Sequence, residues 1–149
     1  MTQHHHLPPI AKLATRFLVE IENAVRGFPR YHKYALGTDL RRQAMQLVVL
    51  CNRAWRDRGG VVHWVNRLVW AIDEIKIALQ LGSQIRAFRS FGVFEQLIRM
   101  AEDIGRQAGG WKRQLQQHPN GQNPAASGRP ERAKTLSART ASATAGANP

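Results

Sequence analysis

The feature that most constrains the fold is an unbroken apolar repeat in the second half of the chain. Seven apolar side chains recur there at alternating intervals of three and four residues, namely Phe94, Leu97, Ala101, Ile104, Ala108, Trp111 and Leu115. A repeat averaging 3.5 residues keeps one stripe against neighbouring helices under left-handed supercoiling, as in four-helix bundles. It predicts a long helix from near Ser90 to about Gln117.

Three earlier segments also have helical periodicity, and none shows strand alternation. They span about residues 8–26, 38–58 and 61–81, and Thr38 suits the N-cap of the second while Gly82 ends the third. The apolar positions are Ile10, Leu13, Phe17, Ile21 and Ala24; Leu40, Leu47, Leu50 and Ala54; and Val65, Leu68, Ile72, Ile75 and Leu79. Short turns between them predict an all-α, antiparallel up-down four-helix bundle.

The two ends of the chain differ from this bundle in composition. Residues 119–149 are rich in Pro, Gly, Ser, Thr and Ala, with Leu136 as the one large apolar side chain. Such a segment buries too little surface to offset its ordering entropy. We therefore predict a flexible N-terminus over residues 1–7, a bundle over 8–118 and a disordered tail over 119–149.

Charge is the outlying property of the composition. The chain has 22 Lys and Arg against 10 Asp and Glu, a net charge of +12. Residues 1–118 hold 18 of those cations and nine of the acids, so most of the excess belongs to the bundle. A charge excess of this size indicates an anionic partner such as nucleic acid, anionic lipid or an acidic protein.

Other features of the sequence indicate the cellular compartment. No apolar run approaches the roughly 18 residues that a membrane span needs, and the N-terminus lacks the pattern of a secretory signal. Cys51 is the single cysteine, so no disulfide framework is possible within the chain. We expect a cytoplasmic protein that does not bind membranes.

The basic residues form rows and clusters in which arginine predominates. Arg99, Arg106 and Arg113 recur every seven residues, opposite the apolar stripe of their helix. The predicted contacts with nucleic acid or a protein partner are Arg30, Lys33, Arg41, Arg42, Arg53, Arg56, Arg86, Arg89, Arg99, Arg106, Lys112 and Arg113. Arginine suits phosphate and RNA recognition because its planar guanidinium makes bidentate and stacking contacts. The alternative is a solvated face.

The second and third helices carry more apolar residues than one stripe requires. The extra positions are Met45, Val48, Trp55, Trp70, Ile77 and Leu81. A bundle helix seldom places Trp and Ile on a face toward water. These residues predict an oligomer interface or docking surface, with coverage by the first helix, or an irregular bundle, as the alternative.

The sequence offers no candidate catalytic residues. No Glu is followed three residues later by His, as di-metal bundles require, and no phosphate-binding or dinucleotide motif occurs. His4–His6 is interpreted as a flexible end or a residual purification tag, His63 and His118 as surface residues, Cys51 as core, and Gly109–Gly110 as a close helix contact or kink. We expect no enzyme activity, cofactor or metal.

Two stretches carry a family resemblance. They are FPRYHKYALGTDL, residues 28–40, and FRSFGVFEQLIRMAEDIGRQAGGWKR, residues 88–113. Together, in a basic four-helix chain, they resemble the accessory variability determinant (Avd) proteins of diversity-generating retroelements, within the S23-type four-helix-bundle group. The resemblance covers about residues 10–117 and excludes the tail.

The resemblance implies a ring-like homopentamer of four-helix protomers that is not itself an enzyme. It also implies two partners, the element's reverse transcriptase and its template RNA or RNA/DNA, and support of mutagenic reverse transcription. The alternative function is an S23-type bundle adaptor that binds RNA or protein without a retroelement role. An adjacent reverse-transcriptase gene with paired template and variable repeats would distinguish the two.

Overall fold

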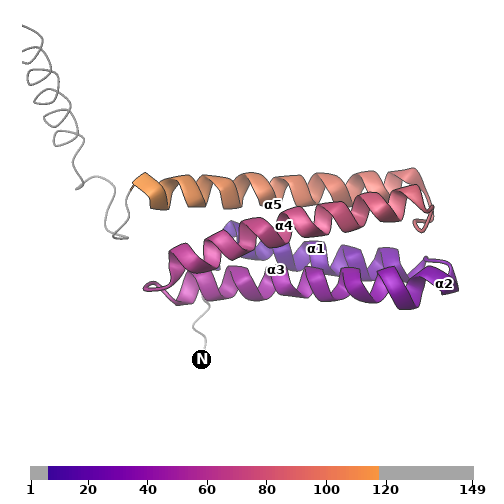
Figure 1. Ribbon diagram of the computed structural model, residues 1–149, viewed down its shortest axis with the longest axis horizontal. Helices are drawn as coiled ribbons and strands as arrows, with labels where there is room; N and C mark the ends of the chain where they lie inside the picture. The colour runs from indigo at the N-terminus through magenta and orange to yellow at the C-terminus, as the bar shows by residue number, and fades with distance from the viewer. Residues whose placement is uncertain (1–6, 118–149) are drawn as a thin grey trace, which may run out of the picture. The chain divides into compact units, whose positions relative to one another are not determined.

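The computed structural model describes residues 7–117, and within that range it is helical with no strand. Four long helices, α1 (Pro9–Arg26), α3 (Thr38–Arg56), α4 (Val61–Gln84) and α5 (Phe91–Gln117), lie side by side as a bundle (Figure 1). Two short elements, α2 (Arg30–His32) and the π-helix η1 (Lys33–Gly37), precede α3. The prediction of an all-helical fold with four long helices is confirmed.

Several predictions fall on residues that the structure leaves undescribed. The flexible N-terminus lies outside the described residues apart from Leu7, and so does the histidine run. His118 and the predicted disordered tail over residues 119–149 also lie outside the described residues.

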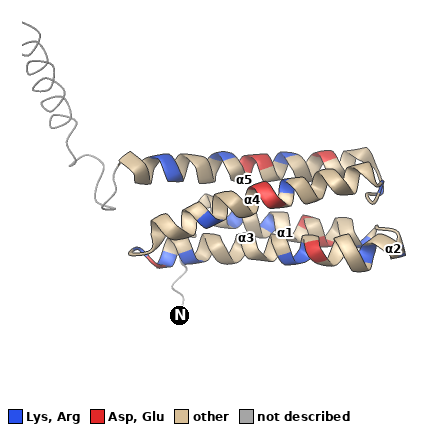
Figure 2. Cartoon of the chain, viewed as in Figure 1, with Lys and Arg blue, Asp and Glu red and all other residues tan. Residues whose placement is uncertain are grey.

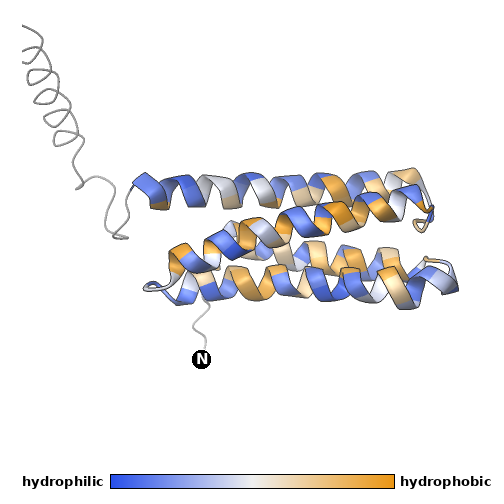
Figure 3. Ribbon diagram, in the orientation of Figure 1, coloured by the Kyte–Doolittle hydropathy of each residue, from blue (hydrophilic) through white to orange (hydrophobic). Residues whose placement is uncertain are grey.

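The core consists of the predicted apolar stripes. Figure 3 shows apolar and polar residues alternating around the helices, the pattern that amphipathic helices require. All the named positions of α3 and α4 are buried, as are those of α1 except the half-buried Leu13. On α5 the four central positions are buried, namely Leu97, Ala101, Ile104 and Ala108. Phe94, Trp111 and Leu115 are half-buried at the ends of that stripe.

The segment before α3 differs from the prediction. Residues 30–37 were expected to form a turn, with Thr38 as the N-cap of the next helix, but the chain is already helical from Arg30. Pro29 takes the cap position, and its carbonyl accepts hydrogen bonds from the amides of His32 and Lys33, both at 2.9 Å. Thr38 therefore lies inside continuous helix, with φ −61° and ψ −42°.

Gly82 does not end α4, which continues to Gln84. A Cβ on Gly82 would lie 2.7 Å from Cε2 of Phe88, so the glycine allows the ring of Phe88 to approach the helix closely. The helix ends in a Schellman motif, in which the amide of Ala87 donates to Gly82 O at 2.9 Å and that of Arg86 to Ser83 O at 3.2 Å. A glycine predicted as a helix stop is instead a packing position.

Arg86 occupies the left-handed position of this motif, with φ 57°. It is the one non-glycine residue with positive φ in the described chain. Glycine usually fills such a position because a Cβ clashes there, at a cost of roughly 1–2 kcal/mol for an L-residue. The α4–α5 connection therefore holds an arginine where backbone geometry favours glycine.

Gly109–Gly110 does not mark a close contact between helices. A Cβ on Gly109 or Gly110 would approach the guanidinium of Arg113 at 3.6 or 3.8 Å, an ordinary contact distance, and meet no other residue closely. The prediction of close helix packing at this pair is wrong, because its open side faces a mobile charged side chain and not a neighbouring helix.

Candidate nucleic-acid interface

Two connections that are distant in sequence meet at one end of the bundle. The ring of Phe28, after α1, packs edge-on against the ring of Phe88, after α4, with centroids 5.1 Å apart. A Cβ added to Gly27 would lie 3.6 Å from Nε of Arg89. These contacts bring together both stretches that carry the family resemblance. We call this region the basic end; its cationic residues are Arg26, Arg30, Lys33, Arg86 and Arg89.

The basic end has no acidic side chain of its own. Residues 23–38 and 77–94, which form it, contain no Asp or Glu, and Figure 2 shows Lys and Arg in blue at this end of the bundle. None of its five cationic residues is ion-paired with a carboxylate of the described residues, and only Lys33 is half-buried. Four of them were predicted; Arg26, at the C-terminus of α1, was missed because the sequence does not show that the two connections meet.

Exposed aromatic rings accompany these charges. Tyr31, Tyr34 and Phe91 are 85%, 71% and 67% exposed. In the sequence, Arg30 and Lys33 each directly precede one of the two tyrosines, and Phe91 lies two residues after Arg89. Cations interleaved with open aromatic rings are typical of surfaces that bind single-stranded nucleic acid.

The arginine row on α5 is partly neutralised. Arg99 pairs with Glu95 at 3.3 Å, and Arg106 pairs with Asp103. Both pairs are well exposed, so each contributes little to stability and can be broken by an anionic partner. Arg113 is exposed and Lys112 is half-buried. The row stays a predicted binding surface, with less uncompensated charge than the basic end.

Arg41 and Arg42 at the start of α3 also have carboxylate partners. Arg41 pairs with Glu22 of α1 at 3.0 Å, and Arg42 pairs with Asp39 at 2.7 Å. Asp39 also accepts a hydrogen bond from Gln43 at 2.6 Å. These two arginines therefore have a structural role in the bundle. Arg41 joins α3 to α1, and Arg42 orders the first turn of α3.

At the other end of α3, the predicted contacts Arg53 and Arg56 line a surface hollow together with Trp64, which was not among the predicted residues. The guanidinium of Arg53 lies 5.3 Å from the ring centre of Trp64 on α4, and that of Arg67 lies 5.8 Å away. The indole Nε1 of Trp64 donates to Asp57 at 2.9 Å. No sequence pattern shows this cluster, because it exists only when α4 folds back beside α3.

The predicted apolar interface is open in the described chain. Met45, Trp55, Trp70, Ile77 and Leu81 are 51%, 44%, 70%, 67% and 48% exposed. Helix α1 therefore does not cover them, whereas an irregular bundle stays as the alternative to an interface. Val48 differs, since it is half-buried against the core, and the neighbouring Val49 is exposed instead. Trp70, Ile77 and Leu81, spaced by seven and four residues, share one face of α4.

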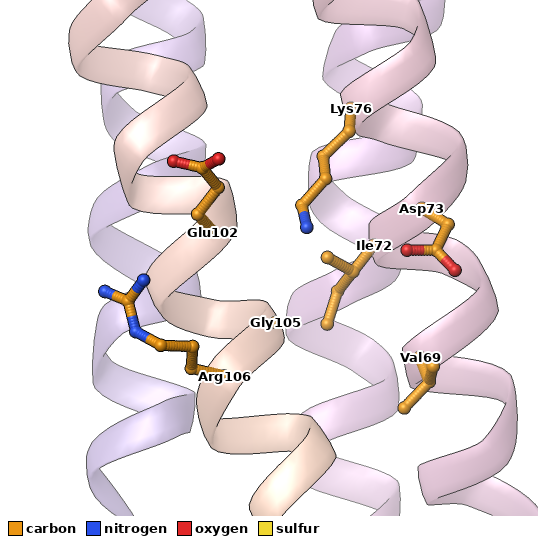
Figure 4. A pocket seen from close by; sticks show the side chains of 7 residues that line it. All are labelled: Val69, Ile72, Asp73, Lys76, Glu102, Gly105 and Arg106. Carbon is orange, nitrogen blue, oxygen red and sulfur yellow. The ribbon is translucent and has the colours of Figure 1, made fainter.

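A hollow between α4 and α5 carries charges of both signs (Figure 4). It is lined by Asp73 and Lys76 of α4 and by Glu102 and Arg106 of α5. The Nζ of Lys76 would be 3.3 Å from a Cβ on Gly105, so this glycine leaves room for the lysine. The mixture of charges gives the hollow no strong preference for an anion, and its residues do not add to the basic surface.

In residues 7–117, no three His, Cys, Asp or Glu side chains are placed to hold a metal ion together. His63 packs beside Trp64 with ring centres 4.8 Å apart. Cys51 is fully buried, as predicted for a core residue. No described helix has an apolar stretch that would cross a membrane.

Comparison with known proteins adds no relative: no family model matches the chain, and no curated protein matches it. The resemblance to Avd proteins therefore stays a prediction that depends on the two motifs.

Proposed function

We propose that this chain is a non-catalytic accessory protein of a diversity-generating retroelement. In this proposal it binds the element's reverse transcriptase and template RNA and supports mutagenic reverse transcription. The observation that carries the proposal is the basic end, where both resembling motifs meet and five cationic residues lack a carboxylate partner among the described residues.

The proposal includes an assembly. The protomer is an antiparallel up-down bundle, which is supported by the short connections between the long helices, such as residues 57–60 and 85–90. The protomers form a ring-like homopentamer, which is supported by the exposed apolar face of Trp70, Ile77 and Leu81. Such a ring would repeat each basic surface several times and so increase affinity for a long RNA.

Binding of labelled RNA at increasing salt concentration tests the nucleic-acid part of this proposal. If about six cationic residues contact phosphates, the logarithm of the association constant should fall against the logarithm of salt with slope roughly −4 to −5. RNA binding without salt dependence, or no RNA binding at all, would contradict the proposed role of the basic surfaces.

Two triple variants with the same change of charge separate the two candidate surfaces. One replaces Arg30, Arg86 and Arg89 with Gln, and the other replaces Arg99, Arg106 and Arg113 with Gln. We expect the first to weaken RNA binding more, because Arg99 and Arg106 already have carboxylate partners. Circular dichroism should show unchanged helicity in both. If RNA affinity is unchanged in both variants, neither surface binds RNA and both are only solvated faces.

The alternative is an S23-type adaptor without a retroelement role. The basic end would suit an RNA or an acidic protein partner in that case too. Genomic context separates the two functions, because the retroelement requires a neighbouring reverse-transcriptase gene and paired template and variable repeats. Purified reverse transcriptase from such a locus should then be retained by the immobilised chain.

A further inference from the structure

At the basic end, the α4–α5 connection encloses a surface hollow whose lining combines charge and aromatic rings. Arg86, Arg89, Ser83 and Ser90 supply its polar groups. Phe91 stands at its edge with most of its ring exposed, and the rings of Phe88 and Phe94 also line it. All of these residues belong to one short segment of chain, so the hollow does not depend on a neighbouring subunit.

Backbone geometry singles out Arg86 within this hollow. Its φ of 57° places it where glycine is favoured, so the position is not explained by the stability of the turn. A residue held in a disfavoured conformation indicates a role for its side chain. Here that side chain is a guanidinium that lines the hollow together with Arg89, and neither is paired with a carboxylate of the described residues.

Phe91 is supported from the core and open toward solvent. The rings of Phe88, Phe94 and Phe91 form a row with successive centroids 5.9 and 5.6 Å apart. Phe88 is buried and Phe94 is half-buried, yet Phe91 is 67% exposed. A ring fixed by packing on one side and open elsewhere can stack on a planar group without further ordering.

We infer that this hollow binds an unpaired nucleotide of single-stranded nucleic acid, with the base against Phe91 and a phosphate between Arg86 and Arg89. A duplex keeps its base faces stacked on each other, so an exposed ring at the surface has access only to unpaired bases. The Asp and Glu side chains of an acidic peptide could pair with the two arginines but have no ring system to stack on Phe91. The inference rests on the proposed nucleic-acid binding and specifies the form of nucleic acid recognised.

The test is fluorescence anisotropy with a labelled single-stranded 12-mer RNA and with a duplex of the same sequence. We expect Phe91→Leu to weaken binding of the single strand by about tenfold, the effect of losing one stacked base, and to change duplex binding less than twofold. Val19→Ala is the control, since it shortens an exposed apolar side chain of α1 that lies outside both the hollow and the proposed subunit contact. It should leave both affinities unchanged.

Arg86→Gly gives a second readout that a purely structural role would not produce. Glycine suits the φ of this position, so the melting temperature should stay the same or rise while single-strand affinity falls several-fold. Arg16→Gln is the charge-matched control, because Arg16 is exposed on α1 and has no carboxylate partner in the described chain. It should reduce affinity less than Arg86→Gly.

The outcomes separate this inference from the proposed function. If the wild-type chain binds RNA and Phe91→Leu binds the single strand equally well, or loses single-strand and duplex affinity alike, the inference is overturned while RNA binding stands. If a polyglutamate peptide competes for the hollow as well as the RNA does, the site is a general anion or peptide site and the inference is also overturned. If the wild type binds no nucleic acid, both fail.

Discussion

The side chains of Arg53, Asp57 and Trp64 contact one another at the turn between α3 and α4. Asp57 accepts hydrogen bonds from Trp64 Nε1 at 2.9 Å and from the amide of Gly60 at 3.0 Å. These hydrogen bonds, made to the ionised form, lower the pKa of Asp57 from its ordinary value of 3.8. Arg53 adds to this effect and also lies over the indole ring.

The lowered pKa predicts a pH-dependent contribution from Asp57. A carboxylate with a depressed folded-state pKa stabilises the fold above its unfolded pKa, and this stabilisation is lost as pH falls through the folded value. Asp57→Asn should therefore lower the melting temperature at pH 7 by a few degrees, with the difference from wild type shrinking below pH 3.8. Thermal melts at a series of pH values measure this, and an equal difference at every pH would contradict it.

Cys51 gives a second residue-level prediction. Burial raises the pKa of its thiol to about 12, from an ordinary value of 9.0. A neutral, enclosed thiol does not react, so a thiol reagent at pH 8 should label the native protein only as fast as it unfolds. Stability should fall as pH rises from 9 toward 12, because the unfolded thiol ionises first. Rapid labelling of the folded chain would show that Cys51 is accessible.

At the scale of the helices, two glycines with different surroundings give opposite predictions. Gly109→Ala should stabilise the protein by about 0.5–1 kcal/mol, because alanine is the better helix former and the new Cβ meets only Arg113 at 3.6 Å. Gly82→Ala should destabilise it by roughly 1–3 kcal/mol, because the Cβ would lie 2.7 Å from the buried ring of Phe88. Urea unfolding measures both, and equal effects would contradict the assigned packing.

The helices were predictable to the extent that local rules determine them. The 3.5-residue repeat correctly predicted α5 and its start after Ser90. The hydroxyl of Ser90 accepts a hydrogen bond from the amide of Val93 at 3.3 Å. The early start before α3 was missed, because a π-helical turn depends on packing: a Cβ on Gly37 would lie 2.7 Å from Val25 of α1. Local pattern cannot reveal that contact.

The candidate site was predictable only in part for the same reason. The sequence identified most cationic positions of the basic end, but it could not show that two connections meet through Phe28 and Phe88. Nor could it show that Arg41 has a partner, because the Glu22–Arg41 pair joins two helices. The pairs of Arg42, Arg99 and Arg106 lie within one helix and follow the spacing of three or four residues. Spatial arrangement, more than residue type, distinguishes the basic end from the other arginine groups.

For the whole molecule, the open apolar face leads to a prediction about assembly. Replacing Trp70 and Ile77 with Glu should convert the oligomer to monomers, because each places a charge in the proposed subunit contact. Val19→Glu on α1 is the control, since Val19 is 54% exposed outside that face. Light scattering should give about five times the chain mass of 16.8 kDa for wild type and control. A monomeric wild-type protein would contradict the ring.

We propose that this basic bundle joins a reverse transcriptase to RNA without acting as an enzyme. The most direct measurement is native mass spectrometry of the full chain co-purified with the reverse transcriptase encoded beside it and the element's template RNA. The account predicts one complex that contains RNA, polymerase and several copies of the chain, and that dissociates at high salt because phosphate contacts contribute to it. A polymerase–RNA complex free of this chain would contradict the account.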